Sequence, residues 1–289
     1  MQMPISYFAD CTALVTGASA GIGREFARQL APVVHTLVLV ARRDDRLKAL
    51  ELELKIINPK LEVFCRQVDL GNRSELERFC GWLDEGDLAI DLLINNAGLG
   101  DYGLFINSEW DRIQAMLDVN ITALTYLTYR ILPRMRRSGC GAILNVSSVA
   151  GLFPVPRVAV YAATKAYVTS LSEALRAELR NSNISVTTLC PGPTPTEFSE
   201  VARRTTEEPT ARGPDFLTVP VQEVVHQGLM AVSRDRARVI PGVAINLIMT
   251  AVAFLPMFVL RLLLNVRAGR PTPVAQATSF DYETSSTGR

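Results

Sequence analysis

The sequence predicts an α/β fold, a doubly wound parallel sheet with helices on both of its faces. Apolar runs of strand length alternate along the chain with longer stretches of helical period. The apolar runs are mostly continuous in Val, Leu, Ile and Thr, as expected for strands that are buried on both faces of a parallel sheet.

The predicted strands come in order along the chain. They cover residues 12–17, 36–41, 62–68, 89–96, 141–148 and 184–191. Between the second and third strands a helix is predicted from an apolar stripe, with Asp44 or Asp45 as its cap; the stripe consists of Leu47, Leu50, Leu54 and Ile57. Residues 164–180 form a further predicted helix. No linker divides residues 1–240, which we expect to form one domain.

Composition excludes several classes of function. Of the 289 residues, 48% are hydrophobic and 20% are charged, and the formal net charge is +1, without the basic surplus of a nucleic-acid binder. His35 and His226 are the only histidines, too few for a zinc site or a Ser-His-Asp hydrolase. The five cysteines show no CxxC spacing, and the first ten residues show no secretory signal. We therefore expect a metal-free cytoplasmic protein with reduced thiols.

A glycine-rich turn, TGASAGIG at residues 16–23, follows the first strand and opens a helix. Its glycines at 17, 21 and 23 let the backbone approach a pyrophosphate at a helix N-terminus, where free N–H groups and the helix dipole favour anions. Such a turn can also be structural only. Its position directly after an apolar strand favours the binding of a dinucleotide cofactor.

The end of the second predicted strand bears on the choice of cofactor. NAD sites usually place a carboxylate there, to bond the ribose 2′-OH. This chain instead has Arg42 and Arg43, whose guanidinium groups suit a phosphate, so NADP(H) is favoured over NAD(H). NAD(H) stays open because Asp44 and Asp45 follow, and the two arginines could also be an ordinary solvated face.

Further motifs stand in a fixed order and identify a family. They are Asp69 in VDL, NNAG at 95–98, Asn120 in VNI, Ser148 in NVSS, Tyr161-Ala-Ala-Thr-Lys165, and Pro191-Gly192. With the glycine-rich turn, the chain resembles the short-chain dehydrogenase/reductases over about residues 10–235. The resemblance implies a Rossmann-type doubly wound sheet and an NADP(H)-dependent enzyme that interconverts a carbonyl and an alcohol.

The resemblance also implies four catalytic roles. Tyr161 would be the general acid in reduction and the base in oxidation, and Lys165 would lower the tyrosine pKa and hold the nicotinamide ribose. Free tyrosine loses its proton only near pH 10, and a nearby ammonium favours the phenolate. Ser148 would hydrogen-bond the substrate carbonyl, where charge develops, and Asn120 would hold a water that passes protons to Lys165.

Cofactor contacts follow from the same resemblance. Asp69 would accept from the adenine amino group, residues 96–98 would lie beside the adenosine ribose, and Thr196 would contact the nicotinamide or phosphate side. The full predicted set is Gly17, Ser19, Gly21, Ile22, Gly23, Arg42, Arg43, Asp69, Asn96, Ala97, Gly98, Tyr161, Lys165, Pro191, Gly192, Thr194 and Thr196.

The substrate is less sharply predicted. Residues 151–160 would form one apolar wall, and residues 196–217 would form either a mobile lid or a plain surface loop. A lipophilic ketone or a 3-oxoacyl compound is expected. The alternative is a catalytically inactive NADP(H)-binding sensor or scaffold, which would be expected to lack Tyr161 or Lys165. A homodimer or homotetramer is implied by the resemblance.

The C-terminal part is unusually apolar. Pro256 divides residues 242–265, so two short amphipathic helices are predicted rather than one membrane span. This extension, 241–268, would pack on the core, lie in a subunit interface, or contact a membrane surface through residues 243–266. Residues 269–289 are expected to be a disordered tail.

Overall fold

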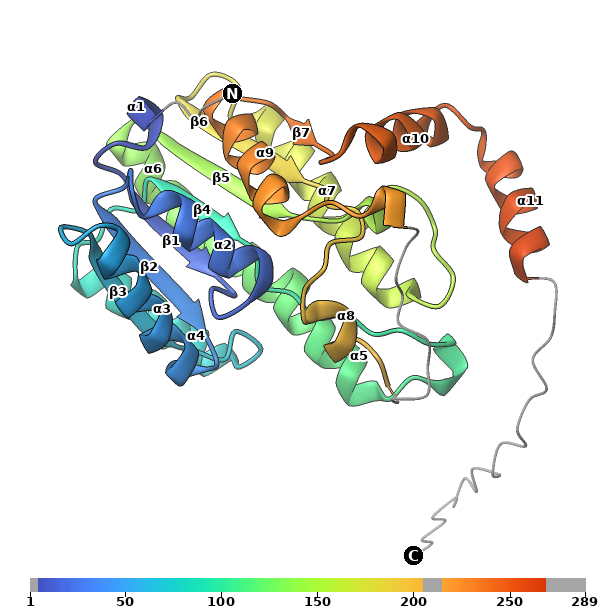
Figure 1. Ribbon diagram of the computed structural model, residues 1–289, viewed down its shortest axis with the longest axis horizontal. Coiled ribbons are helices and arrows are strands. Elements are labelled where there is room, and N and C mark those ends of the chain that lie inside the picture. The colour runs from blue at the N-terminus through green and yellow to red at the C-terminus, as the bar shows by residue number, and fades with distance from the viewer. Residues whose placement is uncertain (1–4, 205–214, 269–289) are drawn as a thin grey trace, which may run out of the picture. The chain divides into compact units, whose positions relative to one another are not determined.

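The computed structural model describes residues 5–204 and 215–268. Its centre is a parallel sheet of seven strands in the order β3-β2-β1-β4-β5-β6-β7, with helices on both faces (Figure 1). The strands are β1 (Thr12–Thr16), β2 (Thr36–Ala41), β3 (Glu62–Gln67), β4 (Leu92–Asn95), β5 (Gly141–Val146), β6 (Ile184–Leu189) and β7 (Arg238–Val239). The doubly wound parallel sheet is confirmed.

All six predicted strands are present, and several end earlier than expected. The residues lost from their carboxyl ends belong to the loops that carry the candidate site. The two-residue strand β7, which pairs in parallel with β6, was not predicted, because two residues are too short to show a hydrophobic pattern.

The described helices are α1 (Ile5–Phe8), α2 (Gly21–Leu30), α3 (Asp44–Ile57), α4 (Arg73–Glu85), α5 (Trp110–Leu117), α6 (Leu124–Ser138), α7 (Ala159–Glu178), α8 (Phe198–Val201), α9 (Val221–Ser233), α10 (Val243–Ala253) and α11 (Met257–Ala268). Short 3₁₀ turns cover η1 (Phe105–Asn107), η3 (Val149–Gly151) and η4 (Asp215–Leu217), and a π-helical turn covers η2 (Asp118–Ala123).

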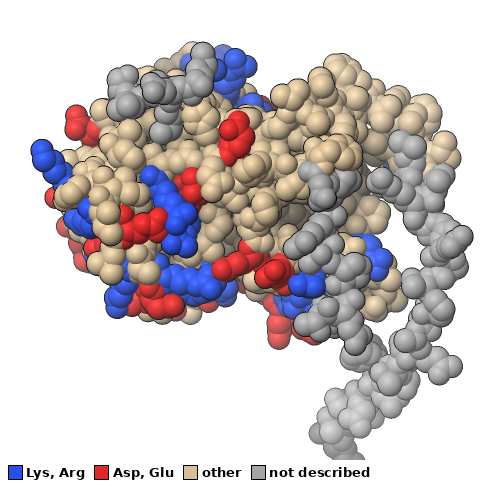
Figure 2. Space-filling view, viewed as in Figure 1, with Lys and Arg blue, Asp and Glu red and all other residues tan. Residues whose placement is uncertain are grey.

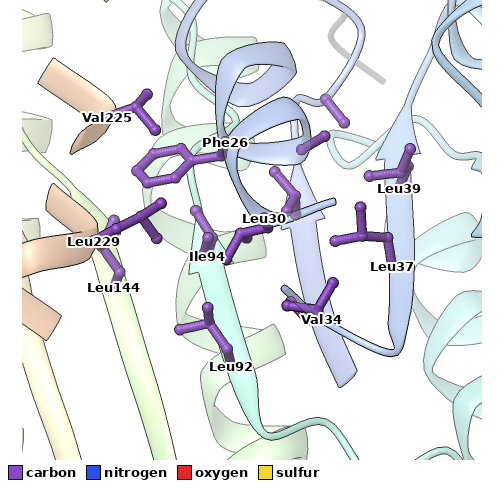
Figure 3. Close-up of a cluster of buried hydrophobic side chains, with 14 of the residues drawn as sticks. Phe26, Leu30, Val34, Leu37, Leu39, Leu92, Ile94, Leu144, Val225 and Leu229 are labelled. Atoms are coloured by element: carbon purple, nitrogen blue, oxygen red, sulfur yellow. The ribbon is translucent and has the colours of Figure 1, made fainter. Parts of the chain in front are cut away.

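Two hydrophobic clusters hold the layers together. One lies between the sheet and helices α2, α3 and α9, and Figure 3 shows Phe26 of α2 beside Val225 and Leu229 of α9. The other lies on the opposite face, under α4, α6 and α7. Both faces of the central strands are therefore covered, which explains their continuous apolar sequences.

Helix α3 confirms the predicted stripe in part and corrects its cap. Leu47, Leu50 and Leu54 are buried, while Ile57 at the end of the helix is exposed. Arg43 stands at the N-cap position without a side-chain cap bond, and Asp44 and Asp45 lie in the first turn. The carboxylates sit there because negative charge is stabilised by the helix dipole, which does not require them to cap.

The strand order indicates where on the sheet a ligand would bind. Strands β2 and β4 pair with β1 on either side, so the order reverses there. In open α/β sheets, ligands bind outside the carboxyl ends of the strands at such a switch point. The glycine-rich turn after β1 and the loop after β4 meet at that place.

The C-terminal part begins inside the compact unit. The chain forms two units, residues 1–251 and 252–289, so the first unit continues beyond residue 240. Ile245 of α10 is buried, and a Cβ on Gly192 would lie 2.2 Å from its Cδ1. The two helices on either side of Pro256 are confirmed as α10 and α11, while the predicted tail 269–289 lies outside the described residues. No helix within the described part of the chain is long and apolar enough to cross a membrane.

Candidate active site

The glycine-rich turn is closely packed and leaves no room for side chains. Gly17 and Gly21 have φ values of 67° and 52°, which favour glycine. A Cβ on Gly23 would lie 2.3 Å from the Gly17 carbonyl oxygen, so the start of α2 and the turn touch through backbone. Because the backbone is bare at the N-terminus of α2, the turn suits a pyrophosphate. The side chain of Ile22, a member of the predicted set, packs against the core instead of facing the turn's surface.

Asn96 holds this turn from the neighbouring strand. Its Nδ2 donates to the Thr16 carbonyl oxygen at 2.9 Å. The backbone amides of Asn96 and Ala97 both donate to Thr16 Oγ1, at 2.9 and 3.0 Å. Thr16, which sequence reasoning did not select, thus joins the ends of β1 and β4. Its place as the first letter of TGASAGIG is the only signal that could have found it.

Arg42 and Arg43 lie in different surroundings. Arg43 donates to Ser19 Oγ through Nε at 3.3 Å and Nη2 at 3.2 Å, so this arginine lies against the glycine-rich turn. Arg42 instead lines a cavity of about 700 Å³ together with Asp69. The remaining lining residues are Arg66, Gln67, Val68, Glu75, Arg78, Phe79 and Trp82.

Asp69 is positioned by local hydrogen bonds at the carboxyl end of β3. Its Oδ1 accepts from the Gly71 amide at 2.9 Å, and its own amide donates to Glu75 Oε2 at 2.7 Å. Because Asp69 also lines the cavity, an exocyclic amino group bound there could donate to its carboxylate.

Asn120 lies in the π-helical turn η2 and is fully buried. Its Oδ1 accepts from the Leu99 amide at 2.8 Å, and its Nδ2 donates to the Leu99 carbonyl oxygen at 2.9 Å and to Thr164 Oγ1 at 3.0 Å. Thr164 in turn donates to the Tyr161 carbonyl oxygen at 2.8 Å. A single π turn inside helical structure is frequent at functional sites, and here it ties the loop after β4 to α7.

Lys165 is buried one turn after Tyr161 on α7. Its Nζ donates to the Val146 carbonyl oxygen at 2.8 Å and lies 5.8 Å from the centroid of the Tyr161 ring. A Cβ on Gly98 would lie 3.3 Å from the same Nζ, so the loop after β4 also borders the ammonium. Burial lowers the pKa of Lys165 to about 8, because the charged form loses hydration.

The pKa of Tyr161 departs from the expectation. In the protein alone, burial raises the pKa of Tyr161 to about 12, and a hydrogen bond with Ser148 acts in the lowering direction. The Tyr161 ring also packs at 5.5 Å from the Phe198 ring, centroid to centroid. Desolvation of the phenolate is thus the largest influence on the pKa of Tyr161 in the folded chain.

Ser148 follows β5 and caps the short turn η3. Its Oγ accepts from the Ala150 amide at 3.1 Å, and it approaches the Pro191 carbonyl oxygen at 3.5 Å. Gly151, which sequence reasoning missed, lets η3 lie directly on α7, since a Cβ there would be 2.5 Å from the Lys165 carbonyl carbon. The hydroxyl of Ser148 is thereby held beside the phenol of Tyr161.

The loop after β6 closes the other side of the site. Thr194 Oγ1 donates to the Gly192 carbonyl oxygen at 3.1 Å. A Cβ on Gly21 would lie 3.2 Å from Thr196 Cγ2, so this loop reaches the glycine-rich turn. Phe198 and Glu197, both missed by sequence reasoning, follow directly; nothing in a polar loop sequence distinguishes them.

The arrangement can bind a dinucleotide along the switch point and move a proton at Tyr161. It also matches a family model described as short chain dehydrogenase over residues 11–207. The chain belongs to the short chain dehydrogenase family.

Relatives of this dehydrogenase include named oxidoreductases. The NADP-dependent 3-hydroxy acid dehydrogenase YdfG of Salmonella typhimurium is 36% identical over 219 residues, 72% of this chain and 86% of its own length. The very-long-chain 3-oxoacyl-CoA reductase-A of Danio rerio is 32% identical over 206 residues. That match covers 68% of this chain and 62% of the Danio rerio protein, less than two thirds of its length.

Solved structures give the same result for the dehydrogenase. A short-chain dehydrogenase from Sphingobium yanoikuyae in complex with NADPH matches with a TM-score of 0.75 at 32% identity, covering 93% of this chain and all (100%) of that one. The bulky-bulky ketone specific alcohol dehydrogenase from Comamonas testosteroni matches with a TM-score of 0.69 at 31% identity. The match covers 93% of this chain and 97% of that one. This dehydrogenase is thus an oxidoreductase that interconverts a carbonyl and an alcohol.

Proposed function

We propose that this dehydrogenase is NADP(H)-dependent and acts on a lipophilic ketone or a 3-oxoacyl compound. The observation that carries the proposal is the buried Lys165 ammonium, held between the Val146 carbonyl and the Gly98 loop, one helical turn from Tyr161. Burial of an ammonium costs free energy, and groups of this kind cluster at functional sites, which supports a functional role for Lys165.

The chain's residues have separate tasks in the proposed reaction. A bound nicotinamide cofactor supplies the hydride in reduction and accepts it in oxidation. Tyr161 gives a proton to the carbonyl oxygen in reduction, and Ser148 donates a hydrogen bond to that oxygen as charge develops on it. Lys165 holds ribose hydroxyls, and Asn120 keeps the Leu99 loop in place beside them.

NADP(H) rather than NAD(H) is supported by the arginines after β2. Arg43 with Ser19 and Arg42 with the cavity beside Asp69 both place guanidinium groups near the adenosine end of the proposed cofactor path. The named preference of YdfG and the NADPH in the Sphingobium yanoikuyae structure agree with this. The absence of side chains at glycines 17, 21 and 23 supports a close approach of a pyrophosphate to the turn.

A lipophilic substrate is supported by the surroundings of Tyr161. Phe198 packs on its ring, and Leu152, Phe153 and Val155 are half-buried in the segment between Ser148 and Tyr161. The names of the Danio rerio and Comamonas testosteroni relatives point to long acyl chains and to bulky ketones. Residues 205–214 of the proposed lid lie outside the described part of the chain.

Turnover of NADPH against two series of substrates tests the proposal. The series are ketones with two bulky substituents and 3-oxoacyl thioesters of increasing chain length, each repeated with NADH. Tyr161→Phe is expected to lower kcat by a factor of about 10² to 10⁴ while NADPH binding, followed by fluorescence, is retained. A Tyr161→Phe variant with wild-type turnover would refute the mechanism, and a wild type inactive on every substrate would favour the inactive sensor or scaffold.

Two further proposals concern the surroundings of the enzyme. A homo-oligomer is supported by the exposed aromatic side chains Trp110, Tyr129 and Tyr167 on α5, α6 and α7, and light scattering of the purified chain tests it. Peripheral membrane contact of a cytoplasmic protein is supported by α10, where Val243, Leu247 and Ile248 are exposed and Figure 2 shows no charged surface. Retention of the full chain in the supernatant after sedimentation with anionic phospholipid vesicles would contradict that contact.

A further inference from the structure

Three segments that are distant in the sequence are joined by hydrogen bonds through Arg43 and the carboxylate of Glu197. They are the glycine-rich turn, the first turn of α3, and the chain between β6 and α8. Arg43 lies at the centre, because it donates to Ser19 Oγ on one side and to Glu197 Oε2, at 3.0 Å, on the other. The set contains two kinds of donor that phosphate-binding sites use, a hydroxyl and a guanidinium.

Arg46 completes this cluster from the same face of α3. Its Nη1 donates to both carboxylate oxygens of Glu197, at 2.7 and 2.8 Å. Arg46 first and Arg43 second lower the pKa of Glu197, so its carboxylate is charged at neutral pH. The side chains of Arg43, Arg46 and Glu197 are 41%, 41% and 47% exposed, so a ligand can reach all three.

We propose that Arg46 is a further ligand of the 2′-phosphate of NADP(H), beside Ser19 and Arg43, and that Glu197 is an internal anion occupying this subsite. The inference rests on the NADP(H) preference proposed above and adds a ligand, Arg46, and a competitor, Glu197, to it.

Charge decides which anion holds the subsite. A phosphate monoester carries close to two negative charges and three acceptor oxygens at neutral pH, whereas Glu197 carries one charge and two oxygens. Ion pairs between exposed side chains are weak and are screened by salt. The 2′-phosphate therefore displaces Glu197, while the 2′-hydroxyl of NAD(H) leaves it in place. Glu197 is on this view a specificity-determining residue, because it lowers affinity for the phosphorylated cofactor alone.

Displacement of Glu197 by the 2′-phosphate would also affect the chain beside the proposed substrate position. Glu197 stands between Thr196, which lies beside Gly21, and Phe198, which packs on the Tyr161 ring. While the carboxylate is bound to the two arginines, this short stretch is tied to α3. Arrival of the 2′-phosphate releases it next to the proposed catalytic tyrosine.

Calorimetric binding of 2′,5′-ADP and of 5′-ADP to the full chain tests the proposal without any turnover. Glu197→Gln removes the charge and keeps the size of the side chain. It is expected to tighten 2′,5′-ADP about fivefold and to change 5′-ADP by less than about twofold. Glu200→Gln removes the same charge three residues further along and is the matched control; its effect on 2′,5′-ADP should be below about twofold.

A second variant addresses Arg46. In the Glu197→Gln background, where this arginine has lost its carboxylate partner, Arg46→Gln is expected to weaken 2′,5′-ADP about fivefold and to leave 5′-ADP unchanged. An unchanged or weaker affinity of Glu197→Gln for 2′,5′-ADP would overturn the competing role. No effect of Arg46→Gln would overturn the added ligand.

The proposed function fails by a different result. A wild type that binds 2′,5′-ADP no better than 5′-ADP would refute the NADP(H) preference. In that case the role of Glu197 is still tested by comparing the 2′,5′-ADP affinity of Glu197→Gln with that of the wild type. A gain in affinity that is specific to 2′,5′-ADP supports the internal anion, and the absence of such a gain excludes it.

Discussion

Asn120 and Leu99 exchange two hydrogen bonds, the Leu99 amide donating to Asn120 Oδ1 at 2.8 Å and Asn120 Nδ2 donating to the Leu99 carbonyl oxygen at 2.9 Å. The side-chain amide of Asn120 thus pairs with the Leu99 backbone in the way that the backbone of a neighbouring β-strand would. Because it fixes the loop after β4 beside Lys165, Asn120 has a positioning role that the expected water relay does not include.

Asn120→Ala should therefore affect both stability and catalysis. It removes the partner of the part-buried Leu99 amide and carbonyl, so the free energy of unfolding should fall by about 1–3 kcal/mol. Turnover should also fall, because Gly98, next to Leu99 in this loop, borders the Lys165 ammonium. Urea denaturation and steady-state kinetics measure the two effects.

The matched control is Asn72→Ala. Asn72 caps α4 by accepting from the Ser74 and Glu75 amides, and its loss should cost about 1 kcal/mol with unchanged kcat. Equal kinetic effects of the two alanine variants would contradict a positioning role for Asn120.

Ser147 and Ser148 are neighbours with different predicted roles. Ser148→Ala removes the hydroxyl beside Tyr161 and should lower kcat by a factor of about 10² to 10³ with little change in cofactor affinity. Ser147 Oγ is buried and donates to the Lys165 carbonyl oxygen at 2.8 Å, so Ser147→Ala should lower stability by about 1–2 kcal/mol instead. A larger loss of kcat in Ser147→Ala than in Ser148→Ala would reverse the assignment.

Gly23 and Gly81 both lie in helices and differ in the space around them. Gly23→Ala would bring a Cβ to 2.3 Å from the Gly17 carbonyl oxygen, whereas nothing lies within 4 Å of a Cβ on Gly81. Gly23→Ala should weaken cofactor binding at least about tenfold, because the turn must open. Gly81→Ala should raise the free energy of unfolding by about 0.5–1 kcal/mol and leave cofactor binding unchanged. Cofactor titration and urea denaturation distinguish the two, and unimpaired cofactor binding by Gly23→Ala would show that the turn can adapt.

Lys165 should make stability depend on pH. Its pKa in the folded protein is lowered to about 8 from 10.5, so between these values the unfolded chain binds more protons than the folded one. The free energy of unfolding should then rise with pH through this window, by up to about 1 kcal/mol per pH unit. The free energy of unfolding is compared with that of Lys165→Met, which has no titrating group at this position, over pH 8 to about 9.5. A constant difference between the two proteins over that range would show that the lysine pKa is not lowered.

The order of the elements could be predicted from the sequence, and so could the residues that make up the candidate site. Continuous apolar runs identify buried parallel strands because such strands face helices on both sides, and the motifs from TGASAGIG to Tyr161-Ala-Ala-Thr-Lys165 are local in the chain. The two helices around Pro256 could be predicted for the same reason, since proline acts on its own neighbourhood.

The contacts of the site residues could be learned only from the tertiary structure. The partners of Asn120 are Leu99 and Thr164, the partners of Glu197 are Arg43 and Arg46, and none of these pairs is close in the sequence. The raised pKa of Tyr161 likewise comes from burial in the folded chain, which a tyrosine–lysine spacing does not report. Sequence spacing determines which residues share a helix face, whereas desolvation and long-range pairing depend on how distant segments pack.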